Sequence, residues 1–258
     1  MRLKNNRKFL LLLPIIMGFI LYSCVEEPTI APVGPVYSVI KIANMSNNVD
    51  AINVSIDGKT VASALAKGET TDYFQSNAGK LVFTVTNGAG DQIYQKTIDI
   101  NVWARTKVIF AGNYDPVELN STFSNFEITD GETYVSSNPP TDSLAIQIIN
   151  ASNDVDTVGS KSFDISAKIV PPDTTIEYAS TTNYSLPLSF SGTYGIGHLA
   201  PGEYTFYFVD DANTTDTITA GPYNLQSNML YNLYLYGNPN NVLVTLKEIV
   251  PPPILPRD

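Results

Sequence analysis

The sequence has very little of what most enzyme active sites and metal centres use. It contains one cysteine, Cys24, and one histidine, His198, in 258 residues. A single cysteine excludes an internal disulfide and a cysteine-based zinc site. A single histidine excludes the HExxH zinc motif, and neither glycine-rich stretch ends in the Lys-Ser/Thr of a P-loop. We therefore expect no enzyme activity, no catalytic residue, no metal and no cofactor, and a structural role for His198.

Charged residues are also scarce, at 16%, and the balance is acidic. The formal net charge is −10, and removal of the four cations among the first eight residues would take it to −14. Such a chain is repelled by nucleic acid, and no basic patch with interleaved aromatic residues offsets the repulsion. The sequence therefore predicts no nucleic-acid partner, and we ascribe the acidity to solubility.

Long apolar runs are absent after the first two dozen residues. The N-terminus has a basic segment, residues 1–8, and an apolar segment, residues 9–21, that contains Pro14 and Gly18. A membrane-spanning helix needs about 20 apolar residues, and this run is shorter. It is typical of a cleaved secretory signal.

The segment Leu21-Tyr22-Ser23-Cys24 resembles the cleavage box of bacterial lipoproteins. This resemblance implies that Cys24 is lipidated, becomes the mature N-terminus and makes the membrane a partner. Two or more acyl chains hold a protein stably where one does not. The following Glu26-Glu27 resembles a signal for the outer face of the Gram-negative outer membrane, where we expect the protein to face outward. A chance cysteine beside a conventional signal is the alternative.

An eleven-residue stretch occurs twice in the remaining chain. Residues 40–50 (IKIANMSNNVD) recur as residues 146–156 (IQIINASNDVD), with seven identities. Each copy opens about a hundred residues of short alternating apolar segments separated by turn residues such as Asp57-Gly58, a pair suited to a tight hairpin. Seven such segments in the first copy are typical of a sandwich. We predict an all-β protein with two tandem immunoglobulin-like β-sandwich domains after a lipoprotein signal peptide.

Proline, glycine and polar residues divide the predicted organisation into six parts. These are a signal peptide (1–23), a lipidated tether (24–36), a first sandwich (37–119), a linker (120–142), a second sandwich (143–250) and a tail (251–258). The linker contains one strand candidate, Phe126 to Thr129.

The second copy also carries an insertion of about seventeen residues after Asp156, because the spacing between equivalent positions grows from 106 to 123. An insertion in one copy is a natural place for ligand specificity. A longer passive hairpin is the alternative.

Aligning the copies places extra tyrosines on the face of the second domain opposite its core. The positions of Thr84, Ile109 and Ala111 in the first copy are occupied by Tyr207, Tyr234 and Tyr236 in the second. Exposed tyrosines suit protein interfaces and sugar stacking. These three are therefore our candidate binding residues for a glycan or a surface protein. Contact with the first domain or cover by the insertion is the alternative.

The repeated stretch also offers oxygen ligands of the kind that calcium uses, in Asn47, Asn48, Asp50 and their counterparts in the second copy. The spacing and the terminal glutamate of an EF-hand are absent. Asn and Asp also form turns by hydrogen-bonding the local backbone. We expect this turn role and no metal.

Several short motifs resemble a bacterial cell-envelope domain family of unknown function. They are Asn44-Met45-Ser46, Val54 to Lys59, Ala78 to Leu81 and Val108 to Asn113, and in the second copy Ile149 to Ser152, Pro201 to Thr205 and Leu230 to Gly237. The resemblance implies a surface β-sandwich and brings no assigned active residues. Asn47 and Asn153 depart from it, since each replaces the family's proline.

Together these features predict an outer-membrane-anchored surface lipoprotein that acts as a non-catalytic adhesion or ligand-binding module, with glycans among the candidate ligands. The alternative is a structural envelope protein or an accessory subunit of a larger surface assembly. The two differ in a checkable feature. A binding module should expose an aromatic patch in the second domain, whereas a structural protein should bury those tyrosines between its domains.

Overall fold

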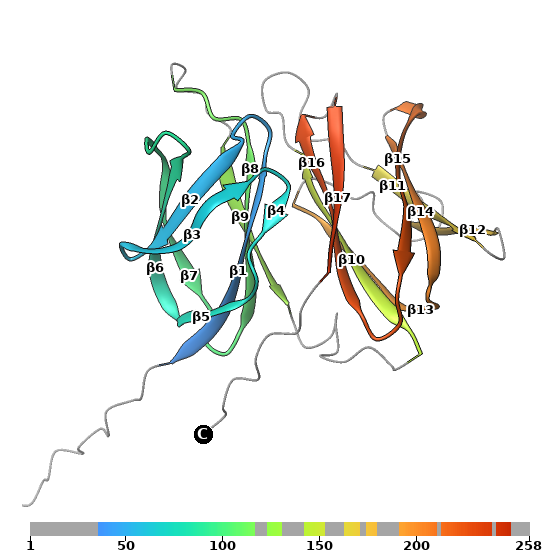
Figure 1. The fold of residues 1–258 in the computed structure, drawn as a ribbon, viewed down its shortest axis with the longest axis horizontal. Coiled ribbons are helices and arrows are strands. Elements are labelled where there is room, and N and C mark those ends of the chain that lie inside the picture. Colours follow the sequence, from blue (N-terminus) through green and yellow to red (C-terminus); the bar gives the residue numbers. More distant parts are fainter. Residues whose placement is uncertain are drawn as a thin grey trace, which may run out of the picture. The chain divides into compact units, whose positions relative to one another are not determined.

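The computed structural model describes residues 36–116, 123–130, 142–152, 163–170, 174–179, 191–210, 213–238 and 241–248. All regular elements in these ranges are strands, which confirms the predicted all-β class (Figure 1). Over the same ranges there is no helix that could cross a membrane. The predicted signal peptide, most of the tether, the tail, the end of the second repeated stretch (residues 153–156) and residues 157–162, which directly follow Asp156, lie outside the described residues.

The first sandwich consists of nine strands in two sheets. They are β1 (Tyr37–Ser46), β2 (Ala51–Ile56), β3 (Lys59–Ala66), β4 (Glu69–Thr70), β5 (Phe74–Asn77), β6 (Gly79–Asn87), β7 (Gln92–Ile100), β8 (Arg105–Gly112) and β9 (Ser124–Asp130). One sheet has the order β4-β1-β8-β9, with β5 also on β1, and the other has the order β3-β2-β6-β7. Strands β1 and β8 are parallel. All seven predicted segments of the first copy are strands.

Strand β9 lies in the segment predicted as the linker, residues 120–142, and contains the strand candidate Phe126 to Thr129. It pairs antiparallel with β8 from Arg105↔Asp130 to Ala111↔Ser124. The first sandwich therefore continues to Asp130, because the open edge of β8 is filled by the next segment of chain.

The β2–β3 connection is the tight hairpin that the Asp-Gly pair predicts. Asp57 (φ 49°) and Gly58 (φ 80°) both have positive φ, as a type I′ turn requires, and Ile56 pairs with Lys59 across it. The Asp57 carboxylate also accepts a hydrogen bond from the Val82 backbone N–H at 2.8 Å.

The second sandwich repeats this arrangement. Its strands are β10 (Leu144–Ser152), β11 (Phe163–Val170), β12 (Thr174–Ala179), β13 (Thr193–Leu199), β14 (Gly202–Asp210), β15 (Asn213–Leu225), β16 (Leu230–Asn238) and β17 (Asn241–Glu248). The sheet orders are β13-β10-β16-β17 and β12-β11-β14-β15, and β10 is parallel to β16 as β1 is to β8. His198, for which the sequence predicts a structural role, lies in β13.

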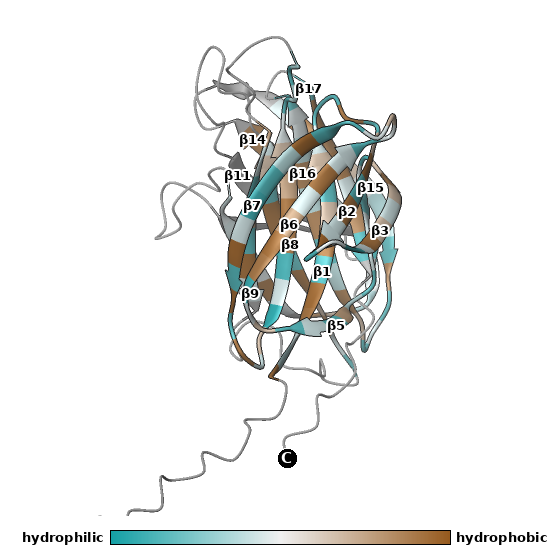
Figure 2. Cartoon of the chain, turned by 90° about the vertical axis from the view of Figure 1, so that its left-hand side faces the viewer, coloured by the Kyte–Doolittle hydropathy of each residue, from teal (hydrophilic) through white to brown (hydrophobic). Residues whose placement is uncertain are grey.

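Each sandwich has its own apolar core, built by alternation along the strands. In β6, Leu81, Phe83 and Val85 are buried in the first core while Val82 between them is exposed. Hydrophobic and hydrophilic residues alternate along the strands of the β3-β2-β6-β7 sheet (Figure 2). In β14, Phe206 is buried in the second core. This period of two is what a strand with one face on a core requires.

Candidate functional site

Four strands depart from this alternation because they are buried along almost their whole length. They are β1, β8, β10 and β16. Their inner faces belong to the cores of their own sandwiches. Their outer faces form a third apolar group, here called the inter-sandwich cluster, which consists of Ala43, Met45, Ile109, Ala111, Ile149, Ala151, Tyr234 and Tyr236, with Phe126 and Ile128 packed against it. Residues of both sandwiches thus share one buried cluster.

Tyr234 and Tyr236, two of the three candidate binding residues, lie in this cluster. Their exposed fractions are 0% and 8%. The expected outward exposure is therefore wrong for these two residues, because residues of the first sandwich cover the outer face of β16. The alternative weighed from the sequence, contact with the first domain, is what the structure shows for them.

The inter-sandwich cluster pairs equivalent positions of the two sandwiches. Ile109 and Ala111 of β8 occupy the positions that Tyr234 and Tyr236 occupy in β16, and all four belong to the cluster. Both phenol rings come from the second sandwich, and the first sandwich contributes only aliphatic side chains and Met45 to the buried part of the cluster. The tyrosines gained by the second sandwich therefore fill space between the sandwiches.

Tyr236 is held closely. A Cβ built on Gly68, in the β3–β4 turn, would collide with the Tyr236 hydroxyl and lie 3.0 Å from its Cζ. Burial raises the pKa of the Tyr236 phenol, and the nearby Glu69 carboxylate raises it further. Glu69 in turn accepts from the Lys247 ammonium at 2.6 Å, an ion pair between strands β4 and β17.

Two lysines are also buried on the outer face of the β1–β8 pair. Lys41 and Lys107 are register partners and are only 3% and 1% exposed. The Lys107 ammonium donates to the Gln147 side-chain oxygen of β10, and the Lys41 ammonium lies 5.5 Å from the centre of the Tyr73 ring. A buried cation is costly without such partners. This polar contact joins the sandwiches beside the apolar cluster.

Tyr207, the third candidate, lies elsewhere. It is in β14 of the β12-β11-β14-β15 sheet, between the core residues Phe206 and Phe208, so alternation turns it to the opposite, outer face. It is partly exposed, and its neighbour in register on β15 is Thr219, which is exposed. The three tyrosines therefore do not form one patch.

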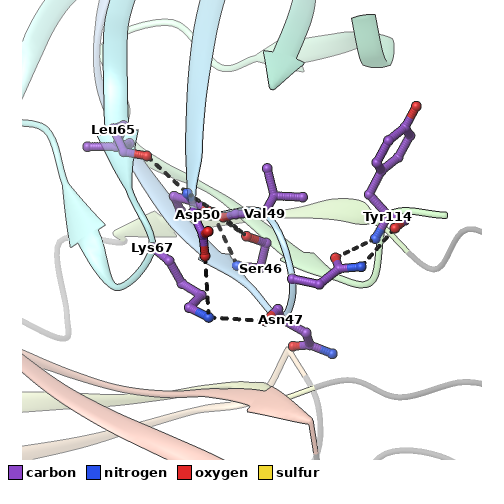
Figure 3. A network of polar contacts seen from close by, with 9 residues as sticks. Ser46, Asn47, Val49, Asp50, Leu65, Lys67 and Tyr114 are labelled. Atoms are coloured by element: carbon purple, nitrogen blue, oxygen red, sulfur yellow. Dashed lines mark hydrogen bonds and ion pairs between the residues drawn. The ribbon is translucent and has the colours of Figure 1, made fainter. Parts of the chain in front are cut away.

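The Asn/Asp-rich stretch has a structural explanation in the first copy (Figure 3). The Asn44 side-chain N–H donates to the carbonyls of Val49 (3.4 Å) and Leu65 (3.0 Å). The Ser46 hydroxyl bonds Asn44 Oδ1 (2.7 Å) and the Val49 carbonyl (2.9 Å). The Asn48 amide bonds both backbone groups of Tyr114, at 2.8 and 2.9 Å. The Asn44, Ser46 and Asn48 side chains are thus bonded to backbone groups, which are local at Val49 and distant along the chain at Leu65 and Tyr114.

The second copy begins in the same way, since Ser152 donates from its backbone N–H (3.0 Å) and its hydroxyl (2.7 Å) to Asn150 Oδ1. The remaining Asn and Asp residues of that copy lie outside the described residues. Where the structure is described, no group of three His, Cys, Asp or Glu side chains is placed to hold a metal ion.

An open groove of about 380 Å³ lies in the first sandwich, between the β2–β3 hairpin and β5. Tyr37 and Phe74 contribute aromatic surface, and Asp57, Lys59 and Gln75 contribute polar groups. Nothing in the alternation pattern of the sequence distinguishes this groove, because it arises from the separation of the two sheets at one end of the sandwich. Cys24 lies outside the described residues.

Residues 38–160 match the family model described as Domain of unknown function (DUF4397). That range runs from the second residue of β1 to the end of β9 and also contains the whole of β10. A domain of this family is therefore present, which confirms the expected relation to a family of unknown function for this part of the chain. The comparison with curated proteins found no match.

Solved structures with distant similarity include a pilin subunit and a protein whose description proposes cell adhesion. The Bacillus anthracis TIE protein aligns with 79% of this chain at 9% identity and a TM-score of 0.25, and this chain spans 34% of that protein. A Bacteroides uniformis protein whose description proposes cell adhesion aligns over 83% of this chain and 97% of its own, at 11% identity and a TM-score of 0.26. The major pilin subunit of Bacillus cereus aligns over 78% and 99%, at 8% identity and a TM-score of 0.21.

Proposed function

We propose that the protein is an outer-membrane-anchored surface lipoprotein, with its anchor on Cys24, that acts as a non-catalytic adhesion or ligand-binding module. In this proposal the second sandwich is a diverged copy of the first. The observation that carries the binding role is the position of Tyr207, which lies on an outer sheet face and is not part of the inter-sandwich cluster.

The surroundings of Tyr207 fit a neutral sugar. Its partly exposed ring is an amphipathic surface for stacking, and exposed Thr217 and Thr219 on β15 supply hydroxyl groups that donate and accept hydrogen bonds. The equivalent position of the first sandwich is Thr84, whose hydroxyl already accepts from the Gln95 side chain at 3.1 Å. The proposed ligand surface is therefore specific to the second sandwich.

The binding role is tested on a glycan array and by affinity pull-down from native envelopes. Tyr207→Thr installs the residue of the first copy and should abolish binding, while Tyr207→Phe keeps the ring and should retain most of it. Thr84→Ala, at the equivalent position of the first sandwich, is the matched control and should bind as the parent does. Unchanged binding by Tyr207→Thr would contradict the assignment of Tyr207 as a binding residue.

The anchor rests on the sequence around Cys24. Cells given a labelled lipid precursor should incorporate label into the parent protein and none into Cys24→Ala. Label that persists in the variant would refute lipidation at this residue. Protease treatment of intact cells then shows on which face of the outer membrane the protein lies, because only an outward-facing protein is cleaved.

A structural role is the second candidate, and a specific observation favours it: Tyr234 and Tyr236 are buried between the sandwiches. A structural protein would use both sandwiches as one spacer or as an accessory subunit. It predicts that loss of the inter-sandwich contact impairs the envelope, and that Tyr207→Thr changes nothing.

A further inference from the structure

The loop between β7 and β8 carries two adjacent apolar residues in solvent. Val102 is 49% exposed and Trp103 is 48% exposed. Across the described ranges only two other large hydrophobic residues, Val82 and Leu243, are comparably exposed, and each is isolated on a strand. A single exposed apolar residue is ordinary, whereas a Val-Trp pair at a loop tip requires a reason.

The backbone of this loop adds to the case. Trp103 has φ 59°, in the left-handed region, which is uncommon for a bulky side chain and which glycine adopts without strain. The chain therefore keeps an aromatic residue where its conformation is disfavoured and where its own core gains little from it. Strained backbone conformations of this kind cluster at functional sites such as ligand clamps.

The loop is tied to the point where the first sandwich begins. The Trp103 N–H donates to the Tyr37 carbonyl at 3.0 Å, and the Ala104 carbonyl accepts from the Val39 N–H at 3.0 Å and the Ser38 hydroxyl at 2.6 Å. Tyr37 follows Cys24 by thirteen residues. Thirteen residues span at most about 45 Å when fully extended, which limits the distance between the anchor and this end of the first sandwich.

We propose that the Val102-Trp103 loop is a lipid-contact site that enters the headgroup region of the membrane carrying the Cys24 anchor. This inference rests on the lipid anchor of the proposed function. Tryptophan favours the membrane–water boundary because its ring is apolar and its indole N–H is polar. The contact orients the first sandwich with the β7–β8 loop toward the lipid and limits its rotation about the tether.

Trp103 is the only tryptophan of the chain, so its fluorescence reports on this loop alone. The lipidated mature protein, which begins at Cys24, is reconstituted into phosphatidylethanolamine–phosphatidylglycerol vesicles, and flotation verifies the anchoring. We expect a blue shift relative to soluble Cys24→Ala protein made without residues 1–23, strong quenching by lipids brominated on their acyl chains, and protection from aqueous acrylamide. A protein that floats with the vesicles but keeps the emission and acrylamide quenching of the soluble form overturns the lipid contact and leaves the anchor intact.

A matched probe places the tryptophan elsewhere. In Trp103→Phe/Leu243→Trp the reporter moves to β17, at a residue that is 39% exposed. Brominated lipid should leave this emission unchanged. Equal quenching of both proteins would show general adsorption and overturn a specific role of the loop. A parent protein that fails to float with the vesicles would refute the lipid anchor and, with it, the proposed loop contact.

Discussion

Gly68 of the β3–β4 turn lies directly against the phenol of Tyr236 in β16, so a turn of the first sandwich contacts a strand of the second. A Cβ at Gly68 would lie 3.0 Å from Tyr236 Cζ and still closer to the hydroxyl. The position also has φ +78°. A side chain at residue 68 would therefore require an unfavourable backbone conformation and would clash with Tyr236.

Gly68→Ala should be destabilising for both reasons. Overpacking costs about 1–3 kcal/mol, in addition to the strain of a positive φ. Gly58→Ala is the matched control, since Gly58 has φ +80° and no atom within 4 Å of its virtual Cβ. In urea unfolding, Gly68→Ala should lose about 1–3 kcal/mol more than Gly58→Ala. Equal losses would mean that Tyr236 does not press on the turn.

Removing a buried tyrosine and removing a tyrosine on the outer face should change the free energy of unfolding by different amounts. Tyr234 is fully buried, so Tyr234→Ala should lower the free energy of unfolding by about 3–5 kcal/mol. Tyr207 lies on an outer face, so Tyr207→Ala should cost about 1 kcal/mol or less. Denaturant midpoints of the two variants test this difference, and a larger loss for Tyr207→Ala would reverse the assignment of the faces.

The buried Lys107–Gln147 contact should respond asymmetrically to mutation. Gln147→Leu removes the acceptor of a buried ammonium and should cost about 1–3 kcal/mol. Lys107→Met keeps the length of the side chain but leaves the buried Gln147 oxygen without its donor, so it should also be destabilising, though less than Gln147→Leu, which leaves a buried charge without its acceptor. The double variant should recover most of the loss of Gln147→Leu in a double-mutant cycle. Additive effects would contradict direct coupling.

Alkaline pH should weaken the fold through its buried phenols. Burial raises the pKa of Tyr94, Tyr204, Tyr223 and Tyr236. An unfolded tyrosine ionises near pH 10, so above that pH the unfolded state loses protons that the folded state still holds. The free energy of unfolding should be level below about pH 10 and fall above it. Tyr236→Phe should make the fall shallower, and an unchanged fall would contradict the raised pKa.

The sequence predicted the strands well because alternation and turn residues depend on the local chain, and because the two copies share the same pattern. Alternation located the cores at residues such as Phe83 and Phe206, and Asp57-Gly58 marked a hairpin. The same alternation could not distinguish water from a second sandwich on the other face. Alternation places Lys41 and Lys107 opposite the core, and nothing in that pattern marks their face as buried. Consecutive apolar residues, as in Val108 to Ala111, were the available signal of burial on both faces.

The central claim is that the second sandwich uses one tyrosine face for internal contact and the other, around Tyr207, for binding. Comparing the binding of the parent and Tyr207→Thr proteins to envelope glycans tests it most directly. The account predicts binding by the parent and by Tyr207→Phe, and loss of at least most of it in Tyr207→Thr at unchanged unfolding midpoint. Full binding by Tyr207→Thr, or none by the parent, would contradict it.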